Sequence, residues 1–343
     1  MNTILVKKIF RRNPFKIKYI PFLSRLYLYS AENSSDQLKS LFLSVPSLLL
    51  FALFQKLWPF KHIGKFIFNI NDKKKIITFD SRNTQYQSLY RREFLNGYES
   101  ETTALLDIIM PLSGVFYDIG SNWGFFSLFI ASKPGFKGKI FAFEPFPSSY
   151  KDLEDILKQS GLMNIKSYPY ALSDQNGTTS MCLPDFIHSG LAMTVNNTVG
   201  KIKMFKLDSL NIHSPSVIKI DAEGAENAIL TGGGETISKF KPMIIFENVK
   251  NYRDTSQTMN PLIFLRDLGY LFFHPCWLKQ NDGLSYLMSS EIRSDLRPFE
   301  TLALVPFNPA DRFLRYNQIN FLACHKKYFK RLKKNFKAYK LYE

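Results

Sequence analysis

Short apolar segments alternate with helical segments along the middle of this chain, and this alternation constrains the fold more than any other feature. Apolar strands are expected at residues 115–119, 139–143, 165–172, 204–207, 217–220, 243–246, 270–274 and 302–305. Helices are expected at residues 98–110, 123–132, 148–160, 226–240 and 261–268. Buried strands that alternate with helices are typical of a mostly parallel sheet with both faces covered. The sequence therefore predicts a doubly wound α/β fold.

The positive charge of the chain is concentrated at its two ends. The net charge is +16. Residues 1–65 contain eleven Lys or Arg and two acids, and residues 311–343 contain ten and two, so residues 66–310 are close to neutral. The neutral middle argues against a nucleic-acid partner. The basic ends are either solvated tails or surfaces for anionic lipid headgroups and phosphates.

Three regions follow from these patterns. We expect a helical N-terminal extension at residues 1–65, a main domain at residues 66–310 and a basic C-terminal helix at residues 311–343. The main domain should open with a hairpin that turns at Lys73–Lys75.

One apolar run in the N-terminal region raises the question of a membrane. Ser40–Gln55 is sixteen residues without a charge, and it contains Pro46. A transmembrane helix needs about 20 apolar residues, so the run is short for a span. A buried helix, an interfacial segment and a true span all stay open.

The cysteines and histidines predict neither disulfides nor a metal site. Cys182, Cys276 and Cys324 are scattered and odd in number, which fits a reducing cytoplasm. The five histidines lack metal-ligand spacing. We therefore expect a cytoplasmic protein without a bound metal, peripheral to the inner face of a membrane if the basic ends contact lipid.

The first strand of the alternation ends in a glycine turn that carries an acid. Asp118, Gly120, Ser121, Asn122 and Gly124 form this turn. Ligands of doubly wound sheets bind beyond the carboxyl ends of the strands, and glycines let the backbone approach a ligand closely. The Gly-x-x-x-Gly spacing differs from that of dinucleotide enzymes. Asp118 would repel a pyrophosphate and suits a cationic ligand.

The second and third strands add candidate contacts for a nucleoside. Glu144 ends the second strand, where an acid can accept both hydroxyls of a ribose. Ala171 and Leu172 end the third strand, where backbone amides could meet an adenine ring.

The densest group of charges follows the strand at 217–220. Lys219, Asp221 and Glu223 alternate with apolar residues there, and Glu247 ends the next strand. Charges at the ends of neighbouring buried strands are costly unless they are paired or used. A structural pair between Lys219 and an acid is one interpretation, and a reactive site at the rim of the ligand pocket is the other.

These segments together resemble the FkbM family of class I methyltransferases. The resemblance runs from about Gly97 to His274, and the family pattern usually has Ala where Ser121 stands and Val where Ala222 stands. It implies a Rossmann-like seven-stranded sheet, S-adenosylmethionine as the cofactor, and O-methylation of a glycan, a lipid-linked saccharide or a secondary metabolite. The residues that carry it are 118–124, 143–145, 171–173, 207–210, 218–226 and 242–247.

The implied reaction needs a base to remove a proton from a hydroxyl that lies about 3 Å from the transferred methyl group. Asp221 is the first candidate, followed by Glu223, Glu247 and His188, which lies in a loop that could cover the site. Lys219 could orient the acid or bind the acceptor.

Three rival functions make different use of the same residues. A nicotinamide enzyme is disfavoured by the glycine spacing and by Asp118. A non-catalytic membrane-associated module would not need the acids at 118, 144, 221 and 223. A nucleic-acid methyltransferase is disfavoured by the neutral middle of the chain, and no Asn/Asp-Pro-Pro-Tyr segment follows the fourth strand.

Overall fold

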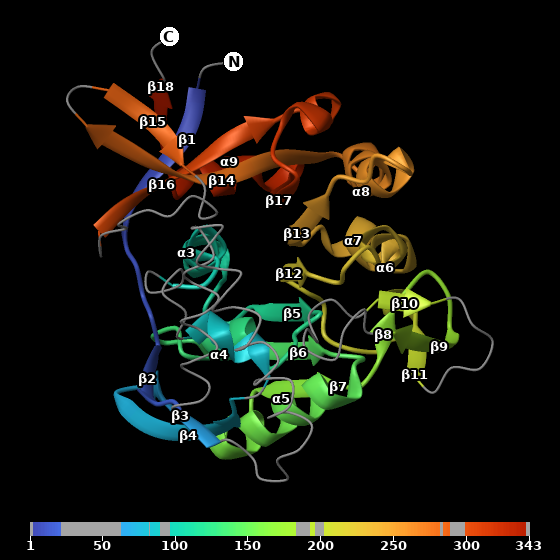
Figure 1. The fold of residues 1–343 in the computed structure, drawn as a ribbon. Helices are drawn as coiled ribbons and strands as arrows, with labels where there is room; N and C mark the ends of the chain where they lie inside the picture. Colours follow the sequence, from blue (N-terminus) through green and yellow to red (C-terminus); the bar gives the residue numbers. More distant parts are fainter. Residues whose placement is uncertain are drawn as a thin grey trace, which may run out of the picture.

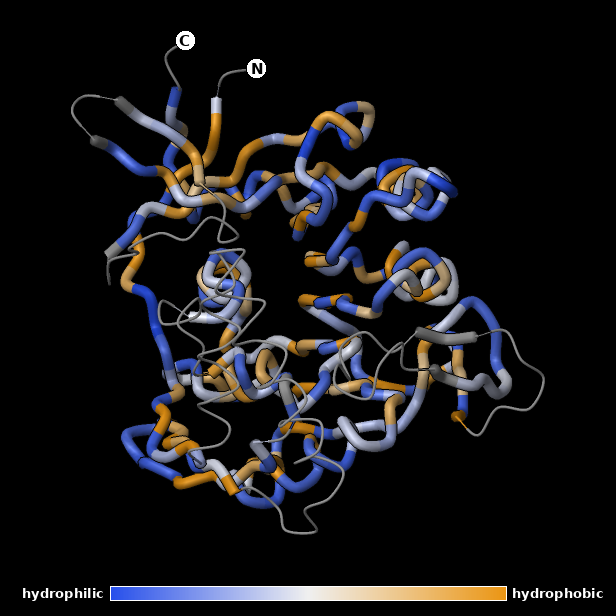
Figure 2. Tube along the Cα trace, viewed as in Figure 1, coloured by the Kyte–Doolittle hydropathy of each residue, from blue (hydrophilic) through white to orange (hydrophobic). Residues whose placement is uncertain are grey.

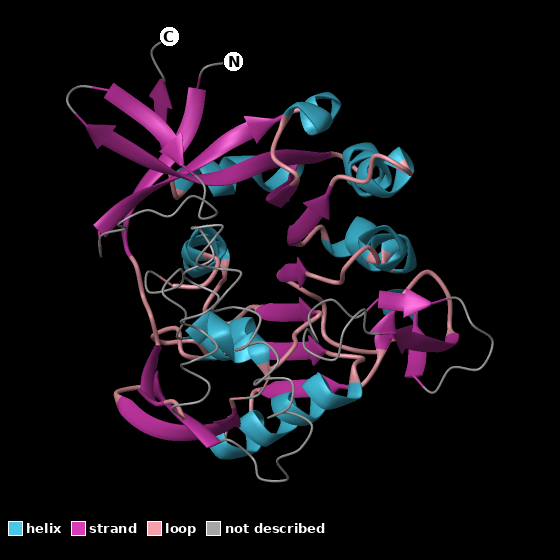
Figure 3. Ribbon diagram, in the orientation of Figure 1, coloured by secondary structure: helices cyan, strands magenta, loops and turns pink. Residues whose placement is uncertain are grey.

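The structure is a computed structural model that describes residues 3–21, 63–81, 83–89, 97–182, 193–195, 202–281, 284–288 and 299–340. A central sheet separates two groups of helices (Figure 1). Figure 3 shows the same arrangement with helices and strands in contrasting colours. The predicted α/β class is confirmed.

Five parallel strands form the half of the sheet that the sequence predicts best. They are β5 (Val115–Ile119), β6 (Lys139–Phe143), β7 (Ile165–Tyr168), β12 (Val217–Ile220) and β13 (Met243–Val249). Their order is β7-β6-β5-β12-β13, so the direction of strand succession reverses between β5 and β12. A crevice for ligands is expected at such a reversal, beyond the carboxyl ends of the strands.

The sheet continues past β13 with antiparallel pairings. The further strands are β17 (Gln318–His325), β14 (Tyr270–Asn281), β16 (Phe299–Phe307), β1 (Thr3–Phe10) and β18 (Lys337–Lys340), in that order. With β15 (Leu284–Met288) paired to β14, the sheet has eleven strands. The prediction of seven strands was therefore too small, because segments from both ends of the chain join the sheet.

Two hydrophobic cores lie on opposite faces of the sheet. Helices α3 (Ser100–Ile109), α4 (Phe125–Ala131) and α5 (Pro147–Ser160) cover one face. Helices α6 (Glu226–Gly232), α7 (Gly234–Phe240) and α8 (Thr255–Asp267) cover the other. Successive strand residues point to opposite faces. Phe116 and Ile140 accordingly pack toward α3–α5, and Tyr117 and Phe141 toward α6–α8.

Helix α5 is amphipathic, whereas the central parallel strands β5 and β6 are hydrophobic on both faces. Figure 2 shows hydrophobic residues concentrated along β5 and β6, whereas much of α5 is hydrophilic. In α5 the buried residues include Leu153, Ile156 and Leu157, spaced as one helical face requires.

A three-stranded antiparallel sheet lies against the start of α4. It consists of β2 (Phe15–Tyr19), β3 (Ile63–Ile70) and β4 (Lys73–Asp80), followed by η1 (Thr84–Leu89). The predicted hairpin is confirmed, but its turn is Asn71–Asp72, where φ is 46° and 60°. Lys73–Lys75 are instead the first residues of β4. The turn falls on Asn71 and Asp72 because a two-residue hairpin turn needs positive φ, which Asn and Asp tolerate and Lys does not favour.

A second small sheet follows β7. Its strands are β8 (Ala171–Leu172), β9 (Gly177–Cys182), β10 (Met193–Val195) and β11 (Ile202–Phe205), and η4 (Leu207–Ser209) follows. The strand expected at 165–172 is therefore divided, and its last residues pair with β11 outside the central sheet.

The helical predictions for the two ends of the chain are wrong where the structure describes them. Residues 3–10 and 15–19 are strands, and residues 318–325 are a central strand. Helical turns at this end are limited to η5 (Pro309–Leu314), η6 (Lys326–Tyr328) and the short α9 (Phe329–Lys334). The apolar run Phe321–Cys324 is fully buried, and a basic surface helix could not bury it.

The apolar run Ser40–Gln55 lies outside the described residues. Within the described ranges, no helix is long and apolar enough to cross a bilayer.

Candidate functional site

The turn after β5 touches the turn after β12, which brings two predicted motifs together. Gly120 has φ +77°, and a Cβ atom there would lie 1.7 Å from the carbonyl oxygen of Asp221. Only glycine permits this approach. Gly124, with φ +93°, begins α4, and Asn122 has φ 50°.

Glu144 is held by the glycine turn itself. Its Oε2 accepts the backbone N–H of Asn122 at 2.7 Å, and its Oε1 accepts that of Phe146 at 2.9 Å. Burial raises the pKa of Glu144 to about 7, although both backbone hydrogen bonds oppose this shift. Each carboxylate oxygen can accept a further hydrogen bond. Glu144 is therefore fixed in position and still able to bind hydroxyls.

Two buried polar atoms beside this turn have no hydrogen-bond partner within the described part of the chain. They are Oδ1 of Asp118 and the hydroxyl of Ser121. The other oxygen of Asp118 accepts the hydroxyl of Ser127 at 2.6 Å. Burial raises the pKa of Asp118 despite the nearby charge of Lys219. Unpaired buried polar groups are costly, so a ligand that reached them would relieve that cost.

Lys219 is the buried cation of the site. Its Nζ lies 2.7 Å from Oδ2 of Asp221 and 4.1 Å from the centre of the Phe126 ring. Burial alone would lower the pKa of Lys219, but the carboxylates of Asp221, Glu99 and Asp118 raise it above its ordinary value. The structural pair between Lys219 and an acid is therefore present.

Glu247 faces the same side of the sheet from β13. Its β17 neighbour in the ladder is Asn320, and Oε1 of Glu247 accepts the side-chain amide of Gln318. The side chain is buried. Burial, together with the charges of Asp221 and Glu99, raises the pKa of Glu247 to about 9.

Glu99 belongs to the same group of charges, although no sequence pattern singles it out. It precedes α3 with φ 40°, and its Oε2 accepts the side-chain amide of Asn320 at 3.1 Å. Burial raises the pKa of Glu99, against the effect of Lys219 and together with that of Asp221. The sequence does place an acid, Glu99, at the start of the helix before the first strand. This position belongs to no known motif, so the acid alone does not indicate a functional residue.

Glu223 and Glu226 complete the acidic rim. Glu223 has φ 32°, and burial together with the charge of Asp221 raises its pKa to about 7. Glu226 accepts the backbone N–H of Gly224 at 3.1 Å, which shapes the turn before α6. Burial raises the pKa of Glu226 as well.

The comparisons with known proteins bear on this arrangement. Residues 115–272 match the family described as the methyltransferase FkbM domain. This chain carries an FkbM methyltransferase domain. The matched residues include the glycine turn, Glu144 and the whole charged group from Lys219 to Glu247, and the cofactor of the domain is S-adenosylmethionine. No curated protein matches the chain.

Several solved structures are similar to the chain, and two of the three described here are methyltransferases by name. The methyltransferase FkbM from Methylobacillus flagellatus is 16% identical, with a TM-score of 0.36, over 57% of this chain and 44% of that one. A SAM-dependent O-methyltransferase from Thermotoga maritima is 13% identical, with a TM-score of 0.33, over 71% and 78%. TYW2 of M. jannaschii, in complex with AdoMet, is 9% identical, with a TM-score of 0.33, over 75% and 86%. The chain thus spans less than half of the length of the FkbM structure. The assignment of the domain to the FkbM family rests on the family match over residues 115–272.

The charges of the FkbM domain fit its cofactor. Glu99, Asp118 and Asp221 lie around the buried cation Lys219, and the charges of Asp221 and Glu99 also act on Glu247. S-adenosylmethionine carries a sulfonium and an ammonium group, and an excess of buried carboxylates favours a cationic ligand. The unpaired atoms of Asp118 and Ser121 and the held carboxylate of Glu144 lie on the neighbouring strand ends.

The structure leaves some predicted residues apart from this group. Ala171 and Leu172 are buried in β8, and their contact with the cofactor stays a prediction. His188 lies outside the described residues. No cluster of metal ligands occurs among the residues that the structure describes.

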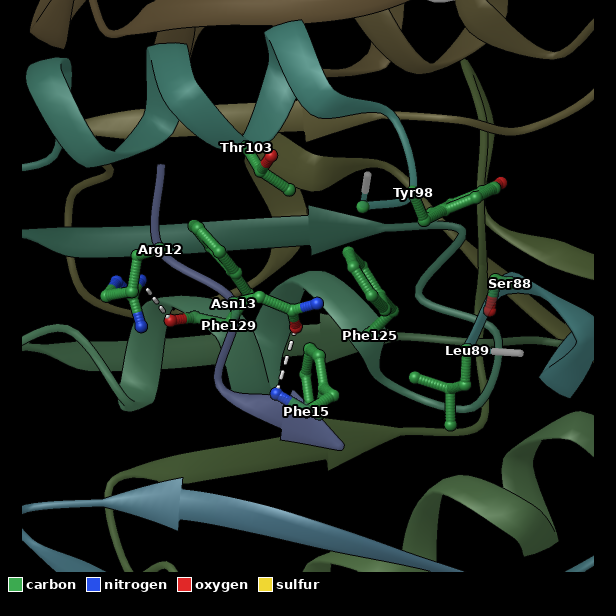
Figure 4. Close-up of a pocket in the computed structure, with 10 residues that line it drawn as sticks. Arg12, Asn13, Phe15, Ser88, Leu89, Tyr98, Thr103, Phe125 and Phe129 are labelled. Carbon is green, nitrogen blue, oxygen red and sulfur yellow. Dashed lines mark hydrogen bonds between the residues drawn. The ribbon is translucent and has the colours of Figure 1, made fainter. Parts of the chain in front are cut away.

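A cavity lies beside the FkbM domain's acidic group and is separate from it. Arg12, Asn13, Phe15, Ser88, Leu89, Gly97, Tyr98, Thr103, Phe125 and Phe129 line it (Figure 4). None of the carboxylates of the site lines this cavity. Arg12 closes one end by pairing with Asp107 at 2.8 Å and donating to the carbonyl of Phe129.

Proposed function

We propose that this protein transfers a methyl group from S-adenosylmethionine to a hydroxyl of a glycan, a lipid-linked saccharide or a secondary metabolite. The observation that carries the proposal is the group of buried and half-buried carboxylates at the carboxyl ends of β5, β12 and β13. A hydroxyl is a poor acid, so the site must also accept its proton.

In this proposal the cofactor is held by residues of β5 and the turn after it, by the residue that follows β6, and by β8. They are Asp118, Gly120, Ser121, Asn122, Gly124, Glu144, Ala171 and Leu172. The bound cofactor supplies an electrophilic methyl group on a cationic sulfur. Glu144 binds the ribose hydroxyls, and the glycine turn lets the backbone approach the ligand.

Residues of β12 and β13 act on the acceptor. Lys219, Asp221, Glu223 and Glu247 are the candidates, as is His188, which lies outside the described residues. Oδ2 of Asp221 already lies 2.7 Å from Nζ of Lys219, so Asp221 is better suited to orient the acceptor. Glu247, which has no such pair with a cation among the described residues, is the stronger candidate for the base.

Calorimetric titration with S-adenosylmethionine tests cofactor use. Binding in the micromolar range is expected, and absence of binding would support a non-catalytic module that kept the fold. Incubation with radiolabelled cofactor and panels of saccharides, lipid-linked saccharides and phenolic or polyketide hydroxyls then tests the acceptor. Label found only in amines or nucleic acid would contradict O-methylation.

We also propose peripheral contact with anionic membranes through the basic ends. Eight exposed Lys or Arg lie between residues 326 and 340 without an acid, and β18 pairs with β1, so the two ends of the chain adjoin. Each basic residue near an anionic surface contributes roughly 1 kcal/mol.

Flotation with vesicles that contain anionic lipid tests this contact. Replacing Lys330, Arg331, Lys333 and Lys334 with Gln should abolish flotation, whereas replacing the exposed Lys73 and Lys74 should not. Unchanged flotation of the first variant would reject the surface. Deletion of residues 1–65 is not a suitable test, because it removes β1 from the sheet.

A further inference from the structure

Two carboxyl groups of the site are held by neighbouring amides of one strand. Gln318 donates to Oε1 of Glu247, and Asn320 donates to Oε2 of Glu99. Gln318 and Asn320 are two positions apart on β17, so their side chains point to the same face. Asn320 is also the ladder partner of Glu247. Glu99 and Glu247 are therefore held over the same part of the sheet.

Lys219, the buried cation of the site, is already bound to another acid. Nζ of Lys219 lies 2.7 Å from Oδ2 of Asp221. Asp118 is also close to Lys219, because the two residues are partners in the ladder between β5 and β12. A hydrogen bond from a neutral amide stabilises an ionised carboxylate less than a hydrogen bond from a cationic side chain does. Glu99 and Glu247 are therefore the pair that lacks full charge compensation in the cofactor-free protein.

We propose that Glu99 and Glu247 share one proton in the free protein, release it when the cationic cofactor binds, and take up the acceptor's hydroxyl proton when the methyl group is transferred. The inference rests on the proposed function and adds Glu99 to the site. Glu247 is the group that receives the proton, and Glu99 is a positioning residue that shares it.

Among the described residues, the charged and titratable groups that face the pair raise its pKa values or are engaged elsewhere, except that the hydrogen bond from Tyr98 lowers the pKa of Glu99. Asp221 and Glu223 face Glu247 from the end of β12, and Lys219 and Tyr98 face Glu99. Burial raises the pKa of Glu247 to about 9 and raises that of Glu99, so a shared proton is retained at neutral pH. Two carboxyl groups in one buried site commonly hold one proton between them.

The bonds and charges of this sequence balance. The hydroxyl O–H bond and the sulfur–methyl bond break, and an oxygen–methyl bond and a carboxyl O–H bond form. The positive charge on sulfur disappears in the same step in which one carboxylate of the pair becomes neutral. The total charge of the occupied site is therefore the same before and after transfer, which avoids leaving an uncompensated buried charge.

Proton release on ligand binding provides a test that needs no acceptor. The binding heat of S-adenosylmethionine is measured at pH 7.5 in two buffers of different ionisation enthalpy, and S-adenosylhomocysteine serves as the matched ligand without the methyl group and its charge. We expect about one more proton to be released by the charged ligand than by the neutral one. Equal release by both ligands would overturn the inference.

Variants assign the proton to its residues. Glu247→Gln and Glu99→Gln should each remove most of the difference between the two ligands, whereas Glu235→Gln on the exposed side of α7 should retain it. Loss of the difference in Glu247→Gln alone would exclude Glu99 from the pair.

Infrared spectroscopy of the unaltered protein gives a second readout. The band of a protonated carboxyl should disappear with S-adenosylmethionine and persist with S-adenosylhomocysteine. If neither ligand binds, the proposed function fails; if both bind with the same proton release and the same infrared band, only the present inference fails.

Discussion

Asn320 in β17 donates a hydrogen bond of 3.1 Å to Glu99, although 221 positions separate the two residues. This contact joins the last central strand to the residue that precedes α3. The candidate site therefore depends on a strand that lies outside the residues 115–272 matched by the FkbM family. Changes in the C-terminal region should consequently affect the site as well as the fold.

A pair of glycine substitutions should separate close packing from backbone strain. In Gly120→Ala the new Cβ would meet the carbonyl of Asp221, so we expect loss of cofactor binding and at least ~3 kcal/mol of destabilisation. Gly224 has φ +84°, but a Cβ there would meet nothing within 4 Å. Gly224→Ala should cost only ~1–2 kcal/mol from backbone strain. Urea unfolding measures both, and equal effects would contradict the contact.

Removal of the buried cation should destabilise the fold strongly. Lys219→Met leaves Asp221 and Asp118 without their nearest positive charge. Breaking a buried ion pair from one side typically costs about 3–5 kcal/mol. The double variant Lys219→Met with Asp118→Asn should recover part of that loss in denaturant titrations. A double variant that is no more stable than the single one would show that Asp118 does not depend on Lys219.

Cofactor binding should depend on pH through Glu144. The pKa of Glu144 is about 7 in the cofactor-free protein, and the ionised form is the better acceptor for ribose hydroxyls. Affinity for S-adenosylmethionine should therefore rise between pH 6 and pH 8 by up to about tenfold. Glu144→Gln should bind more weakly at high pH and lose most of this dependence. A dependence unchanged in that variant would assign it to another group.

The stability of the cofactor-free protein should fall as pH rises. The pKa is about 7 for Glu144 and Glu223 and about 9 for Glu247, against an ordinary value of 4.5. The folded protein thus retains protons that the unfolded chain has released, and stability decreases with pH where this is so. Tm should drop between about pH 5 and pH 9. Glu247→Gln should flatten the upper part of that decline, and a Tm that rises over this range would contradict the assignment.

Arg312 should be among the most sensitive residues of the C-terminal region. It is fully buried, and its guanidinium donates to the side chain and carbonyl of Asn248 and to the carbonyls of Tyr316 and Asn317. Arg312→Met leaves these acceptors unpaired, with an expected cost of about 3–5 kcal/mol. The exposed Arg266→Met should cost less than ~1 kcal/mol. Similar unfolding midpoints for the two variants would show that the contacts of Arg312 contribute little.

The sequence predicted the parallel half of the sheet because its strands are short, apolar and followed by glycine turns. The bounds of β5, β6 and β12 agree with the predicted ones. The cofactor assignment followed from the same turns, because glycine spacing and strand-end acids have direct chemical meaning. The extent of the sheet was not predictable in this way, since pairing between β1, β16 and β18 depends on contacts between distant segments.

The C-terminal region was misread because its charge obscured its apolar run. Phe321–Cys324 would have indicated a buried strand, but the surrounding Lys and Arg suggested one continuous surface helix. Glu99 was missed for a different reason. Its role depends on Asn320, and no local pattern relates the two residues.

The position of β17 has a consequence for biosynthesis. It lies between β13 and β14 in the sheet, yet it follows both in the sequence and is therefore synthesised after them. A ribosome-bound chain that lacks it exposes the apolar edge of β13, and unpaired edges promote aggregation. The central sheet should therefore be completed only after β17 has emerged from the ribosome, and truncation before β17 should increase the protein's demand for chaperones.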